Sequence, residues 1–249
     1  MKYSLHIGLD RVSPAAYGGW NGALSDCVLD ANNMRNVALK NGYQVTILLN
    51  ANACNPSIRD TLKGLAGLAV SGDRVLITYS GHGGQLADTN GDELDKMDET
   101  WCLFDGELTD DAINNLLAMF RVGVEIVVLS DSCHSGTVSR MMKRRKLSKA
   151  KEVLKEVKAS VLLISGCQDA ETSASTGKGG AFTNAFLESY QPKPRTGVLY
   201  KVLDMFFPKP RTALNMGELY NRILVNIRGQ KPNWYETGSK INWKLKTVF

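Results

Sequence analysis

The alternation of short apolar runs with longer amphipathic segments is the feature that most limits how this chain can fold. Five runs rich in Val, Ile and Leu have the length and composition of buried strands. Strands that alternate with helices predict an α/β sandwich with a mainly parallel sheet, and ligands of such sheets bind at the carboxyl ends of the strands. The five runs are 3–9, 43–49, 74–79, 124–130 and 161–165.

Five further segments place apolar side chains three and four residues apart, as one face of a helix requires. The third of them follows Thr109, a residue type that caps helices well, and Asp110 and Asp111 then lie where the helix dipole favours negative charge. We therefore expect Thr109 to cap that helix. The segments are 23–38, 58–68, 113–120, 183–189 and 217–227.

Length and composition are those of a globular protein. The 249 residues are 43% hydrophobic and 22% charged, which excludes a wholly disordered or fibrous chain. No apolar run approaches the roughly 18 residues that span a bilayer, so we expect no membrane as partner. Five cysteines without paired spacing, and an N-terminus without a signal-peptide pattern, predict free thiols in a reducing compartment, the cytoplasm.

The net charge of +5 comes from one basic segment. Residues 139–158 contain nine Lys or Arg and two Glu, whereas residues 88–111 contain ten acids and one Lys. A nucleic-acid-binding face needs basic charge spread over a surface. We therefore do not expect a nucleic acid as partner.

Two strand ends carry residues suited to nucleophilic chemistry. His82 lies between glycines directly after the third run, and Cys133 follows the fourth run among small polar residues. If these strands are neighbours in the sheet, an imidazole could take the thiol proton, and the backbone N–H groups of Gly83 and Cys133 could stabilise an oxyanion. The alternatives are a solvated loop histidine and a structural cysteine. A zinc site of His82, Cys133 and His134 lacks the usual ligand spacing.

These two loops resemble the catalytic loops of the caspase-like cysteine peptidases, above all of metacaspases and their bacterial relatives. His82 precedes Cys133 by 51 residues, close to the spacing of that family. The resemblance extends over residues 1–190 and is weak in the tail from Gln191. The residues that carry it are Ser80-Gly81-His82-Gly83 and Asp131-Ser132-Cys133-His134-Ser135-Gly136, with the stretches 22–34, 164–174 and 179–183.

The resemblance implies one caspase-like domain over residues 1–249, a three-layer sandwich with a twisted sheet of about six strands. A large segment, 1–140, would carry the nucleophile Cys133 and the base His82. A basic linker, 141–157, would join it to a small segment, 158–249. Metacaspases act as monomers, so the resemblance also implies a monomer.

The family's specificity pocket falls on Cys27, Asp30, Ser80 and Asp131. Two carboxylates beside a pocket for an aliphatic stem would pair with a guanidinium. The resemblance therefore implies cleavage of proteins or peptides after Arg, then Lys, with poor cleavage after Asp. Taken singly, Asp30 could instead be a solvated helix carboxylate and Asp131 a turn residue.

An enzyme of this specificity would find its own preferred sites in the basic linker. We expect self-cleavage near Lys143, Arg144, Arg145 and Lys146, because nicking concentrates in exposed polar loops. A solvated basic loop or the start of a helix is the alternative.

No cofactor is required for thiol chemistry, but many metacaspases need calcium. The resemblance implies a Ca²⁺ site at Asp95, Asp98, Asp110 and Asp111, since calcium prefers carboxylate oxygens. Calcium-dependent members also carry an acid shortly after the nucleophile, where this chain has 137–140 without one. The alternative is an acidic surface that attracts basic substrates.

Two other functions remain open: a catalytically inert caspase-like interaction module, and a legumain-like peptidase with different pocket residues. The remaining residues with reactive side chains are expected in structural roles. His6 alternates within a strand and is predicted to be a core residue, and Cys54, Cys102 and Cys167 to be core or loop thiols. Trp234 and Tyr235 could pack on the sheet or line a substrate groove.

Overall fold

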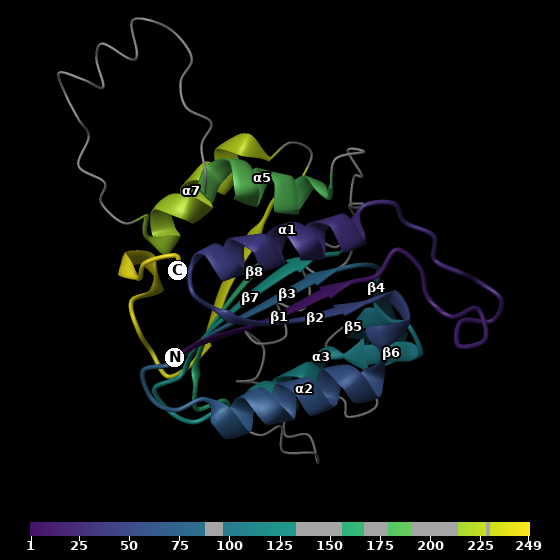
Figure 1. Cartoon of the computed structure of the whole chain (residues 1–249), viewed down its shortest axis with the longest axis horizontal. Helices are drawn as coiled ribbons and strands as arrows, with labels where there is room; N and C mark the ends of the chain where they lie inside the picture. The colour runs from purple at the N-terminus through teal and green to yellow at the C-terminus, as the bar shows by residue number, and fades with distance from the viewer. Residues whose placement is uncertain (88–96, 133–155, 167–178, 191–213, 228–229) are drawn as a thin grey trace, which may run out of the picture.

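The chain forms three layers, a sheet between two layers of helices (Figure 1). The computed structural model describes residues 1–87, 97–132, 156–166, 179–190, 214–227 and 230–249. One face of the sheet carries α1 (Cys27–Lys40), α5 (Ala181–Tyr190) and α7 (Met216–Asn226). The other face carries α2 (Asn55–Leu68) and α3 (Asp110–Leu117). The predicted α/β sandwich is confirmed.

Six strands form the central sheet, and all five predicted strands are among them. The first five are parallel, and the last runs antiparallel to its neighbour. The sixth strand was not predicted, because the sequence left the environment of Trp234 and Tyr235 open. In sheet order the strands are β2 (Gln44–Leu49), β1 (Lys2–Gly8), β3 (Arg74–Ser80), β7 (Glu125–Asp131), β8 (Ser160–Ser165) and β9 (Asn233–Gly238).

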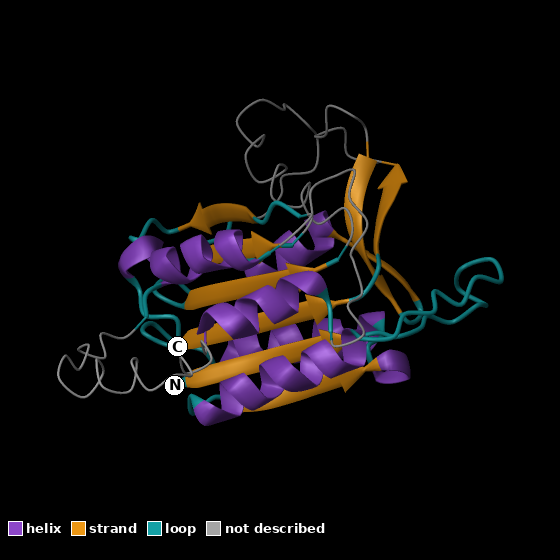
Figure 2. Cartoon of the chain, turned by 90° about the horizontal axis from the view of Figure 1, so that it is seen from above, coloured by secondary structure: helices purple, strands orange, loops and turns teal. Residues whose placement is uncertain are grey.

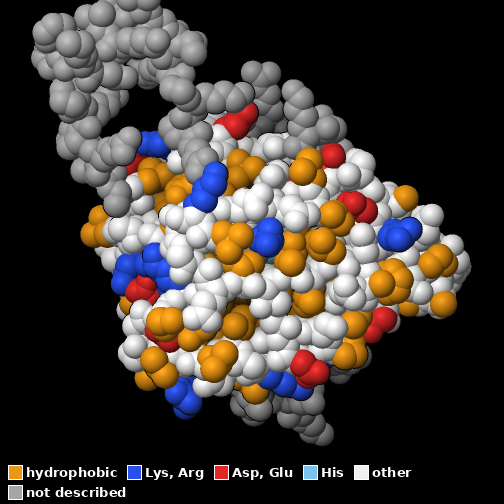
Figure 3. Space-filling view, viewed as in Figure 1, with side chains coloured by type: hydrophobic (Ala, Val, Ile, Leu, Met, Phe, Trp, Pro, Cys, Tyr) orange, Lys and Arg blue, Asp and Glu red, His pale blue; other side chains and the backbone are white. Residues whose placement is uncertain are grey.

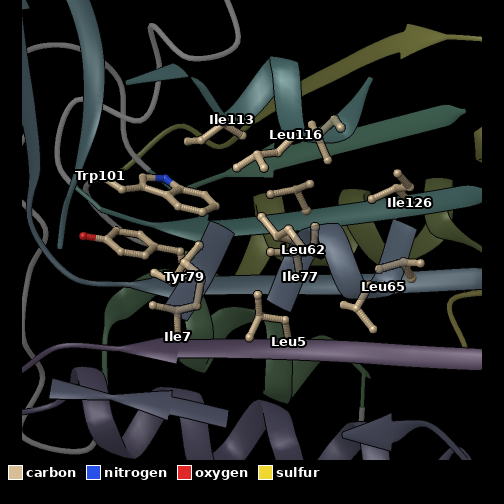
Figure 4. Packing of buried hydrophobic residues seen from close by; sticks show 14 of the residues in the cluster. Leu5, Ile7, Leu62, Leu65, Ile77, Tyr79, Trp101, Ile113, Leu116 and Ile126 are labelled. Atoms are coloured by element: carbon tan, nitrogen blue, oxygen red, sulfur yellow. The ribbon is translucent and has the colours of Figure 1, made fainter. Parts of the chain in front are cut away.

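Each face of the central sheet has its own apolar core, as expected for a sheet covered by helices on both sides. On β3, Ile77 packs with residues of α2 and α3, while its neighbour Leu76 belongs to the cluster under α1, α5 and α7. Figure 4 shows Ile77 with Leu62 of α2 and Leu116 of α3. This double burial explains why the strands are continuous apolar runs.

A second, smaller sheet was not predicted from the sequence. It is antiparallel and consists of β4 (Gly83–Ala87), β5 (Met97–Leu103) and β6 (Gly106–Thr109). It stands beyond one end of the central sheet (Figure 2). Its strands are short and rich in acids and glycine, so they lack the apolar alternation by which strands are usually found.

Trp101 fastens the small sheet to the central one. Its ring stacks on Tyr79 with centroids 4.5 Å apart and an interplanar angle of 3° (Figure 4). Its indole N–H also donates to Ser130 Oγ at 3.2 Å. The ends of β3 and β7 are therefore held by a residue of β5.

The starts of two helices show how caps decide where a helix begins. The Thr109 hydroxyl accepts from the Ala112 N–H at 3.2 Å, which confirms the predicted cap. Helix α1 begins at Cys27 rather than near residue 23, because the carbonyl of Asp10 accepts from Leu24 N–H and its carboxylate from Val28 N–H. Asp10 thereby ties the end of β1 to the first turn of α1.

His6 and Cys102 have the structural roles that the sequence predicted for them. His6 is fully buried between the hydroxyls of Ser4 and Thr78, and burial lowers its pKa to about 3. Cys102 is buried in the apolar core beside α2 and α3.

On the face shown in Figure 3, basic and acidic side chains are interspersed among neutral ones. Among the described residues, no helix combines the length and apolar character needed to cross a bilayer.

Candidate active site

The pairing of β3 with β7 brings the two predicted loops together. These strands are parallel neighbours, with Ser80 opposite Asp131, as the hypothesis of a common edge requires. The N–H of Gly81 donates to the carbonyl of Asp131 at 3.3 Å, so the first residue after β3 is bonded to the last residue of β7. His82 follows Ser80 by two residues, and Cys133 follows Asp131 by two. Cys133 and His134 lie outside the described residues.

The ring of His82 is oriented by a backbone carbonyl. Its Nε2 lies 3.2 Å from the oxygen of Gly22. A carbonyl can only accept, so Nε2 donates and Nδ1 keeps the lone pair of the neutral imidazole. The backbone of His82 is also held, since its oxygen accepts from the Tyr79 hydroxyl at 2.6 Å and from the Cys102 N–H at 3.0 Å. The arrangement leaves Nδ1 as the nitrogen able to take a proton.

Gly22 and Trp20 surround this imidazole and were given no role by sequence reasoning. The ring of Trp20 lies 4.7 Å from that of His82, at 55°. Gly22 has φ +54°, and a Cβ there would stand 3.2 Å from His82 Cδ2 and 3.1 Å from the Trp20 ring. The positive φ thus favours glycine, and a Cβ would also crowd both rings. The signal that could have found them is the aromatic and glycine-rich run 17–22 after a buried strand.

Burial changes the acidity of His82. The side chain is half-buried, and loss of solvation lowers its pKa below the usual 6.5, although the hydrogen bond to Gly22 partly opposes this. Because its pKa lies below 6.5, the His82 imidazole is neutral at pH 7, the form in which it can act as a base.

Gly83, the predicted oxyanion donor, directly follows His82 and opens β4 opposite Trp101.

The four predicted pocket residues lie together where the first turn of α1, which carries Cys27 and Asp30, packs on the ends of β3 and β7, which carry Ser80 and Asp131. Asp30 is 1% and Asp131 4% exposed. The Ser80 hydroxyl donates to Asp30 Oδ2 at 2.9 Å. The thiol of Cys27 shares a hydrogen bond with Ser80, and burial raises its pKa to about 12. The side chains thus form one connected cluster at the carboxyl end of β3 and β7.

The two carboxylates also hold the segment that leads into α5. The N–H of Gly180 donates to both oxygens of Asp30 at 3.1 and 3.0 Å. The N–H and the hydroxyl of Thr183 each donate to Asp131 Oδ2 at 3.0 Å. A Cβ on Gly180 would stand 2.3 Å from Asp131 Oδ2, so only glycine fits between the carboxylates.

Two carboxylates buried together are electrostatically unfavourable. Burial first, and then the nearby charge of Asp131, raise the pKa of Asp30 to about 7, while hydrogen bonds from Gly180 and Ser80 oppose the rise. The cavity beside them, lined by Phe182 among others, has a volume of about 10 Å³, room for about one water molecule. The carboxylates are therefore occupied by hydrogen bonds from Gly180 and Thr183, with little open space beside them.

The predicted metal ligands are only partly described. Asp110 lies near Asp98, Glu99 and Asp111, and its pKa is raised to about 9, first by burial and then by these neighbouring acids. Its oxygens accept from the N–H groups of Asp111 at 2.7 Å and Glu99 at 3.3 Å. Within the described part of the chain, no three His, Cys, Asp or Glu side chains are grouped so as to hold a metal ion.

Two sets of predicted residues fall where the structure gives no description. One is the fourth predicted calcium ligand, Asp95. The other is the predicted self-cleavage site, Lys143, Arg144, Arg145 and Lys146, together with the thiol Cys167.

Comparison with known proteins places this geometry in a family. The family model described as "Caspase domain" matches residues 12–236. Metacaspase-1 of Arabidopsis thaliana is 29% identical over 82% of this chain, and metacaspase-1 of Mycosarcoma maydis is 27% identical over 68%. The chain spans only 65% and 58% of the length of these two relatives.

A solved structure is similar over the whole chain. The crystal structure of a protein from Geobacter sulfurreducens superposes with a TM-score of 0.77 at 35% identity, and the match covers 99% of this chain and 97% of that one. The fold described above is therefore one that an experimentally determined relative adopts.

The surroundings of His82 predict an NMR titration. We expect the His82 imidazole to titrate with a midpoint below pH 6.5, because its partial burial disfavours the charged form. His6, with a pKa of about 3, should stay neutral through the same range. The chain has three histidines, so the spectrum of His82→Asn assigns the signal. A midpoint at or above pH 7 would contradict this account of the site.

Proposed function

Because the chain belongs to the caspase-domain family, we propose that it is a cysteine endopeptidase in which His82 and Cys133 act as base and nucleophile. The observation that carries the proposal is the register of β3 with β7, which pairs Ser80 with Asp131. In the sequence, His82 comes two residues after Ser80 and Cys133 two residues after Asp131. The orientation of His82 by Gly22 supports it, since it leaves Nδ1 free to accept a proton. The chemistry requires no cofactor.

The reaction would proceed through an acyl-enzyme. His82 Nδ1 takes the proton of the Cys133 thiol, and the thiolate attacks the peptide carbonyl. Backbone N–H groups of Gly83 and Cys133 stabilise the oxyanion that forms. The resulting imidazolium of His82 protonates the leaving amine as the C–N bond breaks. His82 then activates the water that hydrolyses the thioester and frees Cys133.

The substrates we propose are proteins with Arg or Lys before the cleaved bond. Support comes from the buried carboxylates of Asp30 and Asp131, whose mutual repulsion a guanidinium would relieve. Ser80 and Cys27 would complete the pocket. Because the cavity beside the carboxylates is small, binding requires the segment around Gly180 to release Asp30.

This specificity predicts a pH-dependent KM. Peptides ending in Arg should be cleaved best, then Lys, with Asp poorest. With the pKa of Asp30 at about 7, its carboxylate ionises as pH rises through 7, so KM for Arg peptides should fall over that range. Asp30→Asn should raise KM about 30-fold and abolish this pH dependence, because it removes one partner of a buried charge pair. Fluorogenic Arg, Lys and Asp peptides, assayed from pH 6 to 8, provide the measurement.

Asp60→Asn is the matched control, because its carboxylate is exposed on α2. It should leave KM unchanged. A wild-type preference for Asp-ending peptides would refute the proposed pocket.

We also propose self-cleavage in the basic linker, near Lys143–Lys146. Its support is the cluster of preferred residues in one polar segment. The wild-type chain should yield two fragments on expression, whereas Cys133→Ala should stay intact, as read by mass spectrometry of both. Adding wild-type enzyme to Cys133→Ala tells whether cutting occurs between molecules. Equal nicking of the two chains during expression would exclude self-cleavage.

Calcium activation is a separate proposal, with Asp95, Asp98, Asp110 and Asp111 as ligands. The buried acids around Asp110 support it, since burial and then the neighbouring acids raise its pKa and a divalent cation would stabilise its charged form. Millimolar calcium should raise both peptidase activity and the melting temperature relative to chelator, and magnesium should not. Asp110→Asn should remove the shift in melting temperature. Equal activity in calcium and chelator would dismiss the proposal.

We further propose that the protein is cytoplasmic and monomeric and meets its partners as substrates. An inert interaction module is the alternative. Labelling of Cys133 by an arginyl chloromethyl ketone separates the two, because only a competent thiolate beside a basic-residue pocket reacts fast.

A further inference from the structure

The loop between β1 and α1 carries an exposed tryptophan directly beside His82. It projects from the edge where the parallel strands end (Figure 1). Trp20 is 47% exposed, although large aromatic side chains are usually well buried. Its ring lies 4.7 Å from that of His82. A half-exposed indole beside the imidazole of the proposed base indicates a surface that contacts a ligand.

The loop holds the indole in a defined position. Tyr17 packs edge-on against Trp20 with centroids 5.9 Å apart, and its hydroxyl donates to the carbonyl of Leu103 at 2.7 Å. The N–H of Trp20 donates to the carbonyl of Tyr17 at 3.1 Å, and that of Gly19 to Pro14 at 2.8 Å. The ring is thus anchored to β5 through Tyr17, which suits a rigid binding surface.

The order of strands tells which part of a substrate would meet this surface. Along the sheet, the loop of Trp20 follows β1, His82 follows β3, and Cys133 follows β7. In the proposed reaction the acyl carbon bonds to Cys133, and the leaving amine takes its proton from His82. The part of the substrate that follows the cleaved bond must therefore pass on the His82 side of Cys133, toward β1. Trp20 lies on that side.

We propose that Trp20 is a specificity-determining residue that binds an apolar side chain immediately after the cleaved bond. This inference rests on the proposed function. The indole offers an apolar face to such a side chain, whereas an acidic side chain would lose hydration there and meet the negative face of the ring. The preference should therefore run Leu, then Gly, then Asp at that position.

The test uses the purified full chain and three internally quenched peptides. They share the Arg before the cleaved bond and differ only in the following residue, Leu, Gly or Asp. Wild type should cleave the Leu peptide with kcat/KM about fivefold above the Gly peptide. Trp20→Ala should bring this ratio close to one, and Trp20→Phe, which keeps a smaller ring, should fall between. Leu39→Ala, at the same 47% exposure on α1, should keep the wild-type ratio.

Each outcome decides the matter. An equal loss on all three peptides in Trp20→Ala would mean that Trp20 only positions His82, and would overturn the inference. A wild type that cleaves all three peptides equally would overturn it too. A wild type that cleaves none of them would instead refute the proposed function, and the inference with it. Should Trp20→Ala fail to fold, a wild-type ratio in Trp20→Phe overturns the inference and a lowered ratio supports it.

Discussion

The register between β3 and β7 is the constraint on which the rest of the site depends. Pairing Ser80 with Asp131 sends both side chains to the face of α1, where they join Asp30 in one cluster. It sends Tyr79 to the opposite face, where Trp101 stacks on it and the Tyr79 hydroxyl holds the backbone of His82. A slip of one residue would exchange these faces, since side chains alternate along a strand. The buried carboxylate of Asp131 and the imidazole of His82 are thus positioned by the same ladder of backbone hydrogen bonds.

The carboxylates of Asp30 and Asp131 connect the architecture with the proposed specificity pocket. They accept hydrogen bonds from Gly180 and Thr183, so they join the part of the chain that carries His82 to the part that carries α5. Burial of two such groups is unfavourable, as the raised pKa of Asp30 shows. Acids that serve only to join segments could be replaced by neutral acceptors without this penalty. Their charge fits the proposed pocket, in which the cation of an Arg or Lys side chain would share the site.

Several features escaped prediction because they arise from contacts between distant residues. The small sheet has buried acids in β5, so its strands lack apolar periodicity, and Trp101 is buried by Tyr79 rather than by its neighbours in sequence. Strand β9 is an edge strand whose Trp234 and Tyr235 pack on opposite faces of the sheet. Helix α1 starts later than its apolar spacing suggests, because Asp10 caps its first turn across a loop. In each case a tertiary partner overrides the local pattern.

The sequence by itself determined the α/β architecture, the five parallel strands and the residues His82 and Cys133 as candidates, whereas Asp30 and Asp131 became candidates only through the resemblance to a known family. Periodicity and residue chemistry are local properties that one chain displays in order. Only the tertiary structure decided that a carbonyl 60 residues upstream, that of Gly22, orients His82. It alone decided that Trp20 flanks the imidazole and that the pKa of Asp30 rises to about 7. Orientation, burial and electrostatics depend on which strands become neighbours, and that choice is made by packing of the whole chain.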